Sequence, residues 1–410
     1  MHALVVLSAC GSGGNGQPML VDAGTDAAVG VDASDTPDAG NVADAGGMAD
    51  AAVPHCTRFT FSTSSPPSYP TGLTPNSLAV KDVNKDGKPD LVVADEDADT
   101  ISVLLGNGSG TFKTKVDYPT GSGPTDLVVV DVNKDGILDI IVANRGSATV
   151  SVLLGNGDGT FKDKGSFATD LLPAALAVGD VNGDTKPDIV VANSGNDLGS
   201  FVSVLIGNGD GTFKPKTDIP TDGSLGAIAV ADLNKDGKLD VVVTNGTDSL
   251  VSVLLGNGNG TFQANVDFPL AGLGAVASAV VVVDVNHDGK LDIVAADNQT
   301  NRANVFLGKG DGSFQAEIDI LVGQTPQGLA VTDVTGDGVP DIVTVGLVAQ
   351  AISVLAGKGD GTFQDRVDTL VGSMPAALTV ADLNGDGVPD IVVGDQDHST
   401  AIVLLGQCVP

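Results

Sequence analysis

The sequence has 410 residues, and its 52 acidic and 20 basic side chains give a formal net charge of -32. This charge argues against nucleic acid as a partner, because phosphate binding needs a basic face, and it favours multivalent cations. Only Glu96 and Glu317 are glutamates, so almost all the acids are aspartates, which prefer turns and ligand loops to helices. With 55 glycines and 20 prolines, the composition predicts strands joined by turns.

Residues 1–10 end in Leu7-Ser8-Ala9-Cys10, which resembles the lipobox of bacterial lipoproteins. The resemblance implies lipidation of Cys10 and export to the bacterial cell envelope, with the anchor at the outer membrane or cell surface as the only membrane contact. The stretch is short and has no Lys or Arg, so a chance run of small residues is the alternative.

Residues 11–54 are rich in Ala, Asp, Gly and Val and contain no Lys or Arg. So little large apolar surface cannot offset the entropy of ordering the chain. We therefore expect a disordered tether between the anchor and the domain that follows.

Residues 55–410 repeat a nonapeptide, first seen as Asp82-Val-Asn-Lys-Asp-Gly-Lys-Pro-Asp90. Successive copies start 49, 49, 52, 52, 49 and 49 residues apart. A glycine-rich turn ending in phenylalanine, as in Leu104 to Phe112, follows each of the first six copies. An internal period of this length predicts one domain of seven structural repeats.

Each repeat predicts four short strands, which in the first copy are Leu78–Val80, Leu91–Ala94, Ile101–Leu105 and Thr111–Tyr118. Seven such units predict an all-β fold, a seven-bladed β-propeller of four-stranded antiparallel blades. An open β-solenoid is the alternative. The last repeat stops at Gly406 without a fourth strand, and a spare strand from Phe59 to Gly72 precedes the first. We therefore expect the N-terminal strand to complete blade seven.

Each nonapeptide has oxygen-bearing side chains at positions 1, 3, 5 and 9. Three carboxylates this close together repel one another unless a cation neutralises them, and flexible all-oxygen sites suit Ca²⁺. No glutamate occupies position 12, which argues against EF-hands. The alternative is a metal-free hairpin held by Asx turns. We expect up to seven bound Ca²⁺ ions, with the following ligands: Asp82, Asn84, Asp86 and Asp90; Asp131, Asn133, Asp135 and Asp139; Asp180, Asn182, Asp184 and Asp188; Asp232, Asn234, Asp236 and Asp240; Asp284, Asn286, Asp288 and Asp292; Asp333, Thr335, Asp337 and Asp341; Asp382, Asn384, Asp386 and Asp390.

The nonapeptides and glycine turns resemble the FG-GAP/VCBS repeat family, which includes the N-terminal propeller of integrin α chains and a fungal sugar-binding lectin. The resemblance covers about residues 57–406 and implies seven blades with calcium between the first two strands of each. Thr185 stands where position 6 has glycine, and Thr335 stands at position 3. We expect those two sites to be the weakest.

The four histidines show no recognisable catalytic spacing, so an enzyme, such as a hydrolase or lyase, is disfavoured. Two other functions remain open: a tethered recognition module for an extracellular protein or glycan, and a structural envelope protein that calcium only rigidifies. Asp or Asn begins the loop after the second strand in six repeats, at 95, 144, 193, 245, 297 and 395. These side chains form either a ligand-binding ring or Asx turns.

Cys56 lies before the spare strand, and Cys408 follows Gly406. In an exported protein we expect them to form a disulfide that closes the ring. Two unrelated thiols are the alternative.

Overall fold

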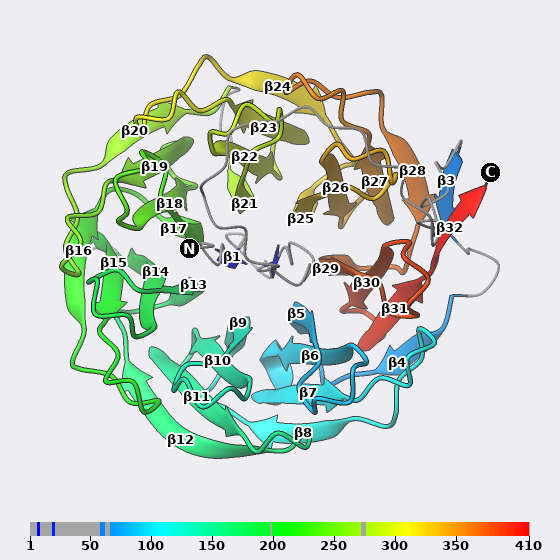
Figure 1. Cartoon of the computed structure of the whole chain (residues 1–410), viewed down its shortest axis with the longest axis horizontal. Coiled ribbons are helices and arrows are strands. Elements are labelled where there is room, and N and C mark those ends of the chain that lie inside the picture. The colour runs from blue at the N-terminus through cyan, green and yellow to red at the C-terminus, as the bar shows by residue number, and fades with distance from the viewer. Residues whose placement is uncertain are drawn as a thin grey trace, which may run out of the picture.

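The computed structural model describes residues 6–8, 19–20, 58–61, 66–196, 199–271 and 276–409. Seven blades of four antiparallel strands each surround a common axis, which confirms the predicted seven-bladed propeller (Figure 1). Within these residues, the only helical element is a 3-10 turn, η1 (Glu96–Ala98).

Blades 1 to 6 each use four consecutive strands, ordered from the axis to the rim. Blade 1 contains β5 (Pro75–Lys81), β6 (Asp90–Asp95), β7 (Thr100–Leu104) and β8 (Val116–Pro119), and blade 2 contains β9 (Pro124–Val130), β10 (Asp139–Asn144), β11 (Thr149–Gly155) and β12 (Phe161–Ala168). Blade 3 contains β13 (Pro173–Gly179), β14 (Asp188–Asn196), β15 (Gly199–Leu205) and β16 (Thr217–Thr221), and blade 4 contains β17 (Leu225–Ala231), β18 (Asp240–Asn245), β19 (Leu250–Leu254) and β20 (Val266–Pro269). Blade 5 contains β21 (Ala277–Val283), β22 (Asp292–Asp297), β23 (Arg302–Phe306) and β24 (Ile318–Leu321), and blade 6 contains β25 (Pro326–Thr332), β26 (Asp341–Gly346), β27 (Ala351–Leu355) and β28 (Val367–Leu370).

Blade 7 joins the two ends of the propeller. It contains β29 (Pro375–Ala381), β30 (Asp390–Asp395), β31 (Thr400–Leu404) and the early strand β4 (Ser68–Pro70), whose Tyr69 pairs with Ala401. Beside it, β3 (Arg58–Phe61) pairs with β32 (Gly406–Val409), and Phe61 faces Gly406 as Phe112 faces Gly106 in blade 1. The expected completion of blade seven by the N-terminal strand is confirmed.

The segment before β3 is described only at β1 (Val6–Ser8) and β2 (Met19–Leu20). These strands pair with each other, and β1 also pairs with β17 near the axis (Figure 1). Cys10, Cys56 and most of residues 11–54 lie outside the described residues. The lipid anchor and the tether therefore stay predictions.

The three inner strands of each blade are apolar on both faces because each blade is packed between two others. In β6, Leu91 and Val93 pack against blade 7, whereas Val92 and Ala94 pack against blade 2. Such doubly buried strands read as continuous apolar runs. The rim strands alternate or are exposed instead, as in β8.

The fourth strand is shorter than predicted in most blades. In blade 1, Phe112 makes an isolated bridge with Gly106, and the ladder resumes only at Val116. The prediction of one strand over Thr111–Tyr118 is therefore wrong at its start. Phe112 instead packs edge-on against Tyr69 of the preceding blade, with ring centroids 5.3 Å apart. The ring of Phe112 therefore packs in the interface between two blades and does not belong to the fourth strand.

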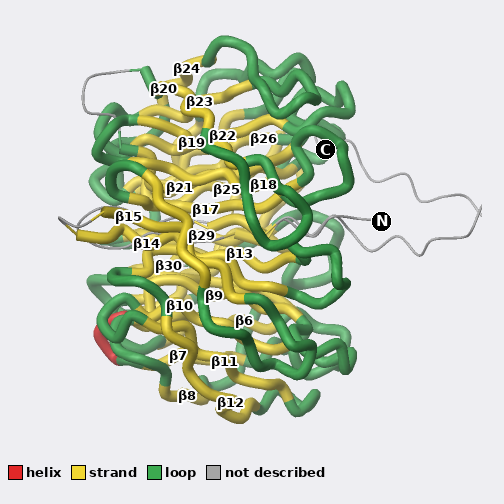
Figure 2. Tube along the Cα trace, turned by 90° about the vertical axis from the view of Figure 1, so that its left-hand side faces the viewer, coloured by secondary structure: helices red, strands yellow, loops and turns green. Residues whose placement is uncertain are grey.

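The antiparallel order places the loops on two opposite faces of the ring (Figure 2). The nonapeptides and the glycine turns lie on one side, the nonapeptide face. The loops between second and third strands, including η1, and the connections between blades lie on the other side, the connection face. The strand order therefore separates the predicted calcium loops from the most variable loops.

Candidate metal centres

Every nonapeptide lies between the first and second strands of its blade, as the repeat resemblance implies. Positions 1, 3 and 5 lie on the turn, and position 9 is the first residue of the second strand, as Asp90 is of β6. The structure therefore brings each predicted set of four residues into one loop.

Hydrogen bonds within the first loop hold its oxygens close together. The amide of Asp86 donates to Asp82 Oδ1 at 3.1 Å and to Asn84 Oδ1 at 2.8 Å. The amide of Gly87 donates to Asp82 Oδ2, and that of Lys88 donates to Asp86 Oδ1. Since two side-chain oxygens accept from one amide, the ligand positions 1 and 3 converge on the same space.

The backbone conformation explains the glycine at position 6 and shows that position 4 also has a left-handed conformation. Position 6 has positive φ in all seven loops, from 68° to 83°, and the value of 68° belongs to Thr185. A β-branched side chain is strained in this region. Position 4 is also left-handed, including Lys85 and His287 at 59° and 56°. Sequence reasoning missed position 4, although glycine at 183, 336 and 385 was a signal for it.

Thr335 behaves differently from the asparagines at position 3. Its amide donates to Asp341 Oδ2 at 2.9 Å, and its hydroxyl oxygen is buried with no hydrogen-bond partner among the described residues. The amide of Asp337 accordingly donates to Asp333 at 3.2 Å rather than being shared with position 3. The arrangement of oxygen donors in this loop therefore differs from that of the other loops at position 3, where the sequence has threonine instead of asparagine.

The aspartate at position 9 is buried and holds the loop to the sheet. In blade 1, Asp90 accepts the amide of Val83 at 3.0 Å through Oδ2 and that of Gly106 at 2.7 Å through Oδ1. Burial raises the pKa of the equivalent Asp139 and Asp188 to about 6. Position 9 therefore has a structural role, and its role as a calcium ligand stays a prediction.

The oxygen atoms of the nonapeptide side chains are of the chemical type that Ca²⁺ prefers. Positions 1, 3 and 5 of six loops offer two carboxylates and one amide oxygen, all hard donors. Among the described residues, no three acidic, histidine or cysteine side chains are arranged to hold a metal ion by themselves. A bound Ca²⁺ would therefore also need the side chain at position 3 and a main-chain oxygen, such as that at position 7. It would supply charge neutralisation and rigidity to a turn otherwise held only by amides.

The ring of Asp and Asn on the connection face points inward. All six side chains are 2 % exposed or less. Asn245 and Asp297 accept amides two and three residues ahead, so the Asx-turn interpretation is confirmed in blades 4 and 5. Asn144 and Asn193 instead donate to serines of the third strand at 2.9 Å. These buried amides are structural and do not form a ligand-binding ring.

Three polar side chains meet on the connection face, and the sequence did not predict this contact. Ser373 Oγ lies 3.1 Å from Nδ1 of His398, which lies 2.8 Å from Asp395 Oδ2. In a catalytic triad, serine and aspartate contact different ring nitrogens. Here both contact Nδ1, so the group is not a triad. The residues are separated by 25 positions in the sequence and meet only because the blade connection returns to this loop.

A profile of FG-GAP-like repeats matches residues 82–142, 131–191, 180–243, 232–295, 284–344 and 333–393. The chain belongs to the FG-GAP-like repeat family. These six overlapping matches run from the first nonapeptide to the last, in agreement with the predicted resemblance. No significant match was found among curated proteins.

Solved structures share the FG-GAP propeller's fold at low sequence identity. A lectin of Agrocybe aegerita that recognises terminal N-acetylglucosamine is 23% identical, with a TM-score of 0.51 over 71% of this chain and 79% of its own. The periplasmic gluconolactonase of Pseudomonas aeruginosa is 16% identical, with a TM-score of 0.54 over 71% and 84%. Virginiamycin B lyase of Staphylococcus aureus is 13% identical, with a TM-score of 0.54 over 85% and 100%. These likenesses show the fold alone.

Two findings concern the predicted membrane anchor and disulfide. The described part of the chain contains no helix with the length and apolarity needed to cross a membrane. The backbone of Cys408 faces Phe59 in the β3–β32 ladder, and Cys56 lies beyond the described end of β3. The disulfide therefore stays a prediction.

Proposed function

We propose that this FG-GAP propeller is a calcium-binding recognition module, exported and tethered at the cell envelope, that binds a protein or glycan on its connection face. The observation that carries the proposal is the distribution of exposed apolar side chains. Leu73, Leu171, Leu172, Val348 and Met374 are exposed on the connection face, whereas the described part of the nonapeptide face exposes no large apolar side chain. Exposed apolar side chains rimmed by polar residues are typical of interaction sites.

The location of the chain ends supports the same orientation. Because β31 runs from the connection face to the nonapeptide face, β32 and its partner β3 lie at the nonapeptide side of blade 7. A tether that precedes β3 would leave the domain on that side. The connection face would then be directed away from the anchor.

The predicted role of calcium is to rigidify the scaffold. The amide of Gly110, in the glycine turn of blade 1, donates to the carbonyl of Leu383 in the nonapeptide of blade 7 at 3.2 Å. The same contact joins Gly260 of blade 4 to Val181 of blade 3 at 3.0 Å. A cation that fixed one nonapeptide would therefore stiffen a blade interface and, through it, the positions of the connection loops.

A glycan array and a pull-down from surface extracts, both with the calcium-loaded chain, test the proposal. We expect a partner whose capture is lost when Leu73 and Met374 are both changed to serine. The matched control changes Val116 and Val266 to serine, since these are similarly exposed but lie on the rim. Equal loss in both variants would contradict the choice of face. No partner in either experiment would favour the purely structural role.

A further inference from the structure

The rims of blades 5 and 6 differ from those of the other blades at one register position. Near the connection-face end of the ladder between the third and fourth strands, the fourth-strand residue is proline in blades 1, 3, 4 and 7, where Pro119, Pro220, Pro269 and Pro70 face Thr100, Phe201, Leu250 and Thr400. In blade 2 it is Ala168, on a strand with a bulge near Gly165. In blades 5 and 6 it is Leu321 and Leu370. Proline and bulges protect edge strands from pairing with other chains, and these two edges have neither.

The same two rims carry the most exposed large apolar side chains of the described residues. Leu370, Val367 and Leu321 are 79, 68 and 64% exposed. All three lie on β24 or β28. Their exposure is a cost in water unless another surface covers them.

The backbone of Leu321 faces outward. Four blades accept proline at this position without losing the ladder, so the amide at this position is not needed by the third strand. The next residue confirms the alternation, because the amide of Val322 donates inward to Asn301 at 3.0 Å. Leu321 therefore directs its N–H and C=O to the open edge of β24, with which no described strand pairs.

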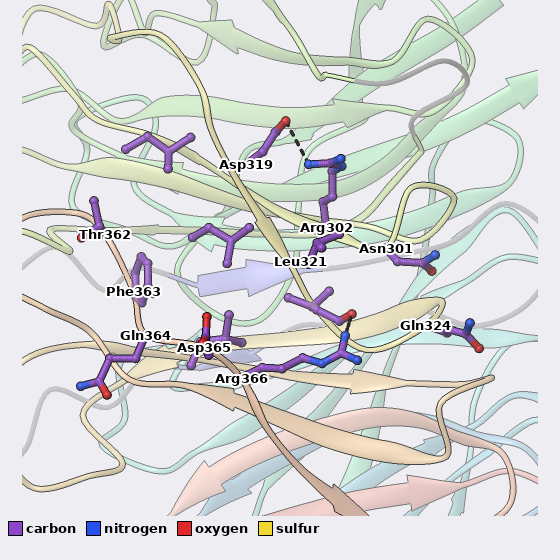
Figure 3. A pocket seen from close by; sticks show the side chains of 14 residues that line it. Asn301, Arg302, Asp319, Leu321, Gln324, Thr362, Phe363, Gln364, Asp365 and Arg366 are labelled. Atoms are coloured by element: carbon purple, nitrogen blue, oxygen red, sulfur yellow. Dashed lines mark hydrogen bonds and ion pairs between the residues drawn. The ribbon is translucent and has the colours of Figure 1, made fainter.

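A groove of about 870 Å³ lies along this edge, between the rims of blades 5 and 6 (Figure 3). Ile318, Ile320 and Leu321 line one side, and Phe363 lies on the other. The groove thus combines apolar walls with an unpaired strand edge, the two features used by proteins that bind peptides by strand addition.

The groove carries basic as well as acidic side chains, since Arg302 and Arg366 line it together with Asp319 and Asp365. These arginines are two of only four in a chain of net charge -32. Arg302 contacts Asp319 through Nη1 at 3.2 Å, and Arg366 contacts Asp368 through Nε at 3.2 Å and the carbonyl of Val322 through Nη1. A guanidinium has five N–H donors, so both retain donors for a further carboxylate.

We propose that this groove binds an extended polypeptide segment with alternating apolar and acidic side chains, which pairs with β24 as an added strand. Its apolar side chains contact Ile318 and Ile320 on one face of β24, and its carboxylates, on the other face, reach Arg302 and Arg366. The site is separate from the connection face and does not depend on the function proposed for that face.

The test uses the calcium-loaded full chain and a fluorescein-labelled peptide of about ten residues, alternating Val and Asp, with fluorescence anisotropy as the readout. A peptide alternating Val and Lys is the charge control. We expect Leu321→Pro, which copies blades 1, 3, 4 and 7, to weaken binding about tenfold by removing one backbone donor. Leu321→Ser keeps the amide and, like Arg366→Gln, should weaken binding less. Val116→Ser, on the rim of blade 1, should have no effect.

Melting curves verify that each variant is folded. The proposal is overturned if the Val–Asp peptide does not bind, if the Val–Lys peptide binds as tightly, or if Leu321→Pro binds as the wild type does. It is also overturned if Leu321→Pro abolishes self-association of the chain, since a second copy would then be the occupant. Retained peptide binding after the Leu73 and Met374 changes would show that the two surfaces are independent.

Discussion

Replacing Asp95 by asparagine is expected to stabilise the propeller at neutral and alkaline pH. Asp95 is fully buried at the end of β6, where Oδ2 lies 2.6 Å from Ser102 Oγ. Ser102 Oγ also lies 2.8 Å from Asp117 Oδ1. A hydroxyl has one hydrogen, so it can donate to only one of these two carboxyl groups. The other contact needs a proton on the carboxyl oxygen, and buried Asp95 is the group that retains it.

The magnitude follows from the pKa. Burial raises the pKa of Asp95 from the ordinary 3.8 to about 7, against smaller opposing effects of the Ser102 and Gly72 hydrogen bonds. Below 3.8 the folded and unfolded states both bind the proton, and no penalty exists. Between 3.8 and about 7 only the folded state keeps the proton, so the free energy of unfolding falls as the pH rises. Above 7 the loss is constant, at about 4 kcal/mol by 1.36 kcal/mol per pH unit.

Asparagine avoids this loss, because its amide donates to the serine without a titrating proton. Blades 2 and 3 already use this arrangement, with Asn144 donating to Ser151 and Asn193 donating to Ser203 at 2.9 Å. We expect Asp95→Asn to raise the free energy of unfolding by about 2–4 kcal/mol at pH 8 and to leave it nearly unchanged at pH 4.

Urea unfolding at pH 4 and pH 8, at fixed calcium, measures the difference. The matched control is Asn144→Asp, which should destabilise blade 2 at pH 8 far more than at pH 4. The reasoning is refuted if Asp95→Asn is less stable than the wild type at pH 8, or if its effect is the same at both pH values.

Excess chelator is expected to lower the melting temperature by several degrees or more, and calcium to restore it, because ligands that bind only the folded state stabilise it. An unchanged melt would remove the case for metal binding. Thr185→Gly should raise the free energy of unfolding by about 1 kcal/mol, because glycine adopts the positive φ of this position without strain. The reverse change at the equivalent position, Gly237→Thr, should lower it by a similar amount. A destabilised Thr185→Gly or a stabilised Gly237→Thr in urea unfolding would contradict this. Peptide mapping without reductant should recover Cys56 joined to Cys408. Finding both thiols free in protein taken from an oxidising compartment would exclude the disulfide.

The strand pattern and the blade count could be predicted because both depend on local periodicity. The completion of blade seven could also be predicted, since a missing strand at one end matched a spare strand at the other. The orientation of Asp95 could not, because its partner Ser102 lies on the next strand and both faces of β6 are buried. Position 9 has a structural role that the sequence does not reveal, for a related reason. Its acidic side chain suits a metal, but its oxygens accept amides contributed by another turn, such as Gly106.

The pairing of β4 with β31 has a consequence for how the chain reaches its folded state. Ser68 and Ile402 are neighbours in one sheet although they are synthesised at opposite ends of the domain, roughly 330 residues apart. At 5–20 residues per second, roughly 17–67 s pass before β4 can find its partner. Bringing such distant segments together also costs about 5 kcal/mol of chain entropy. The ring therefore closes only after translation of the domain is complete, and until then both open ends expose strand edges that invite aggregation or capture by a chaperone.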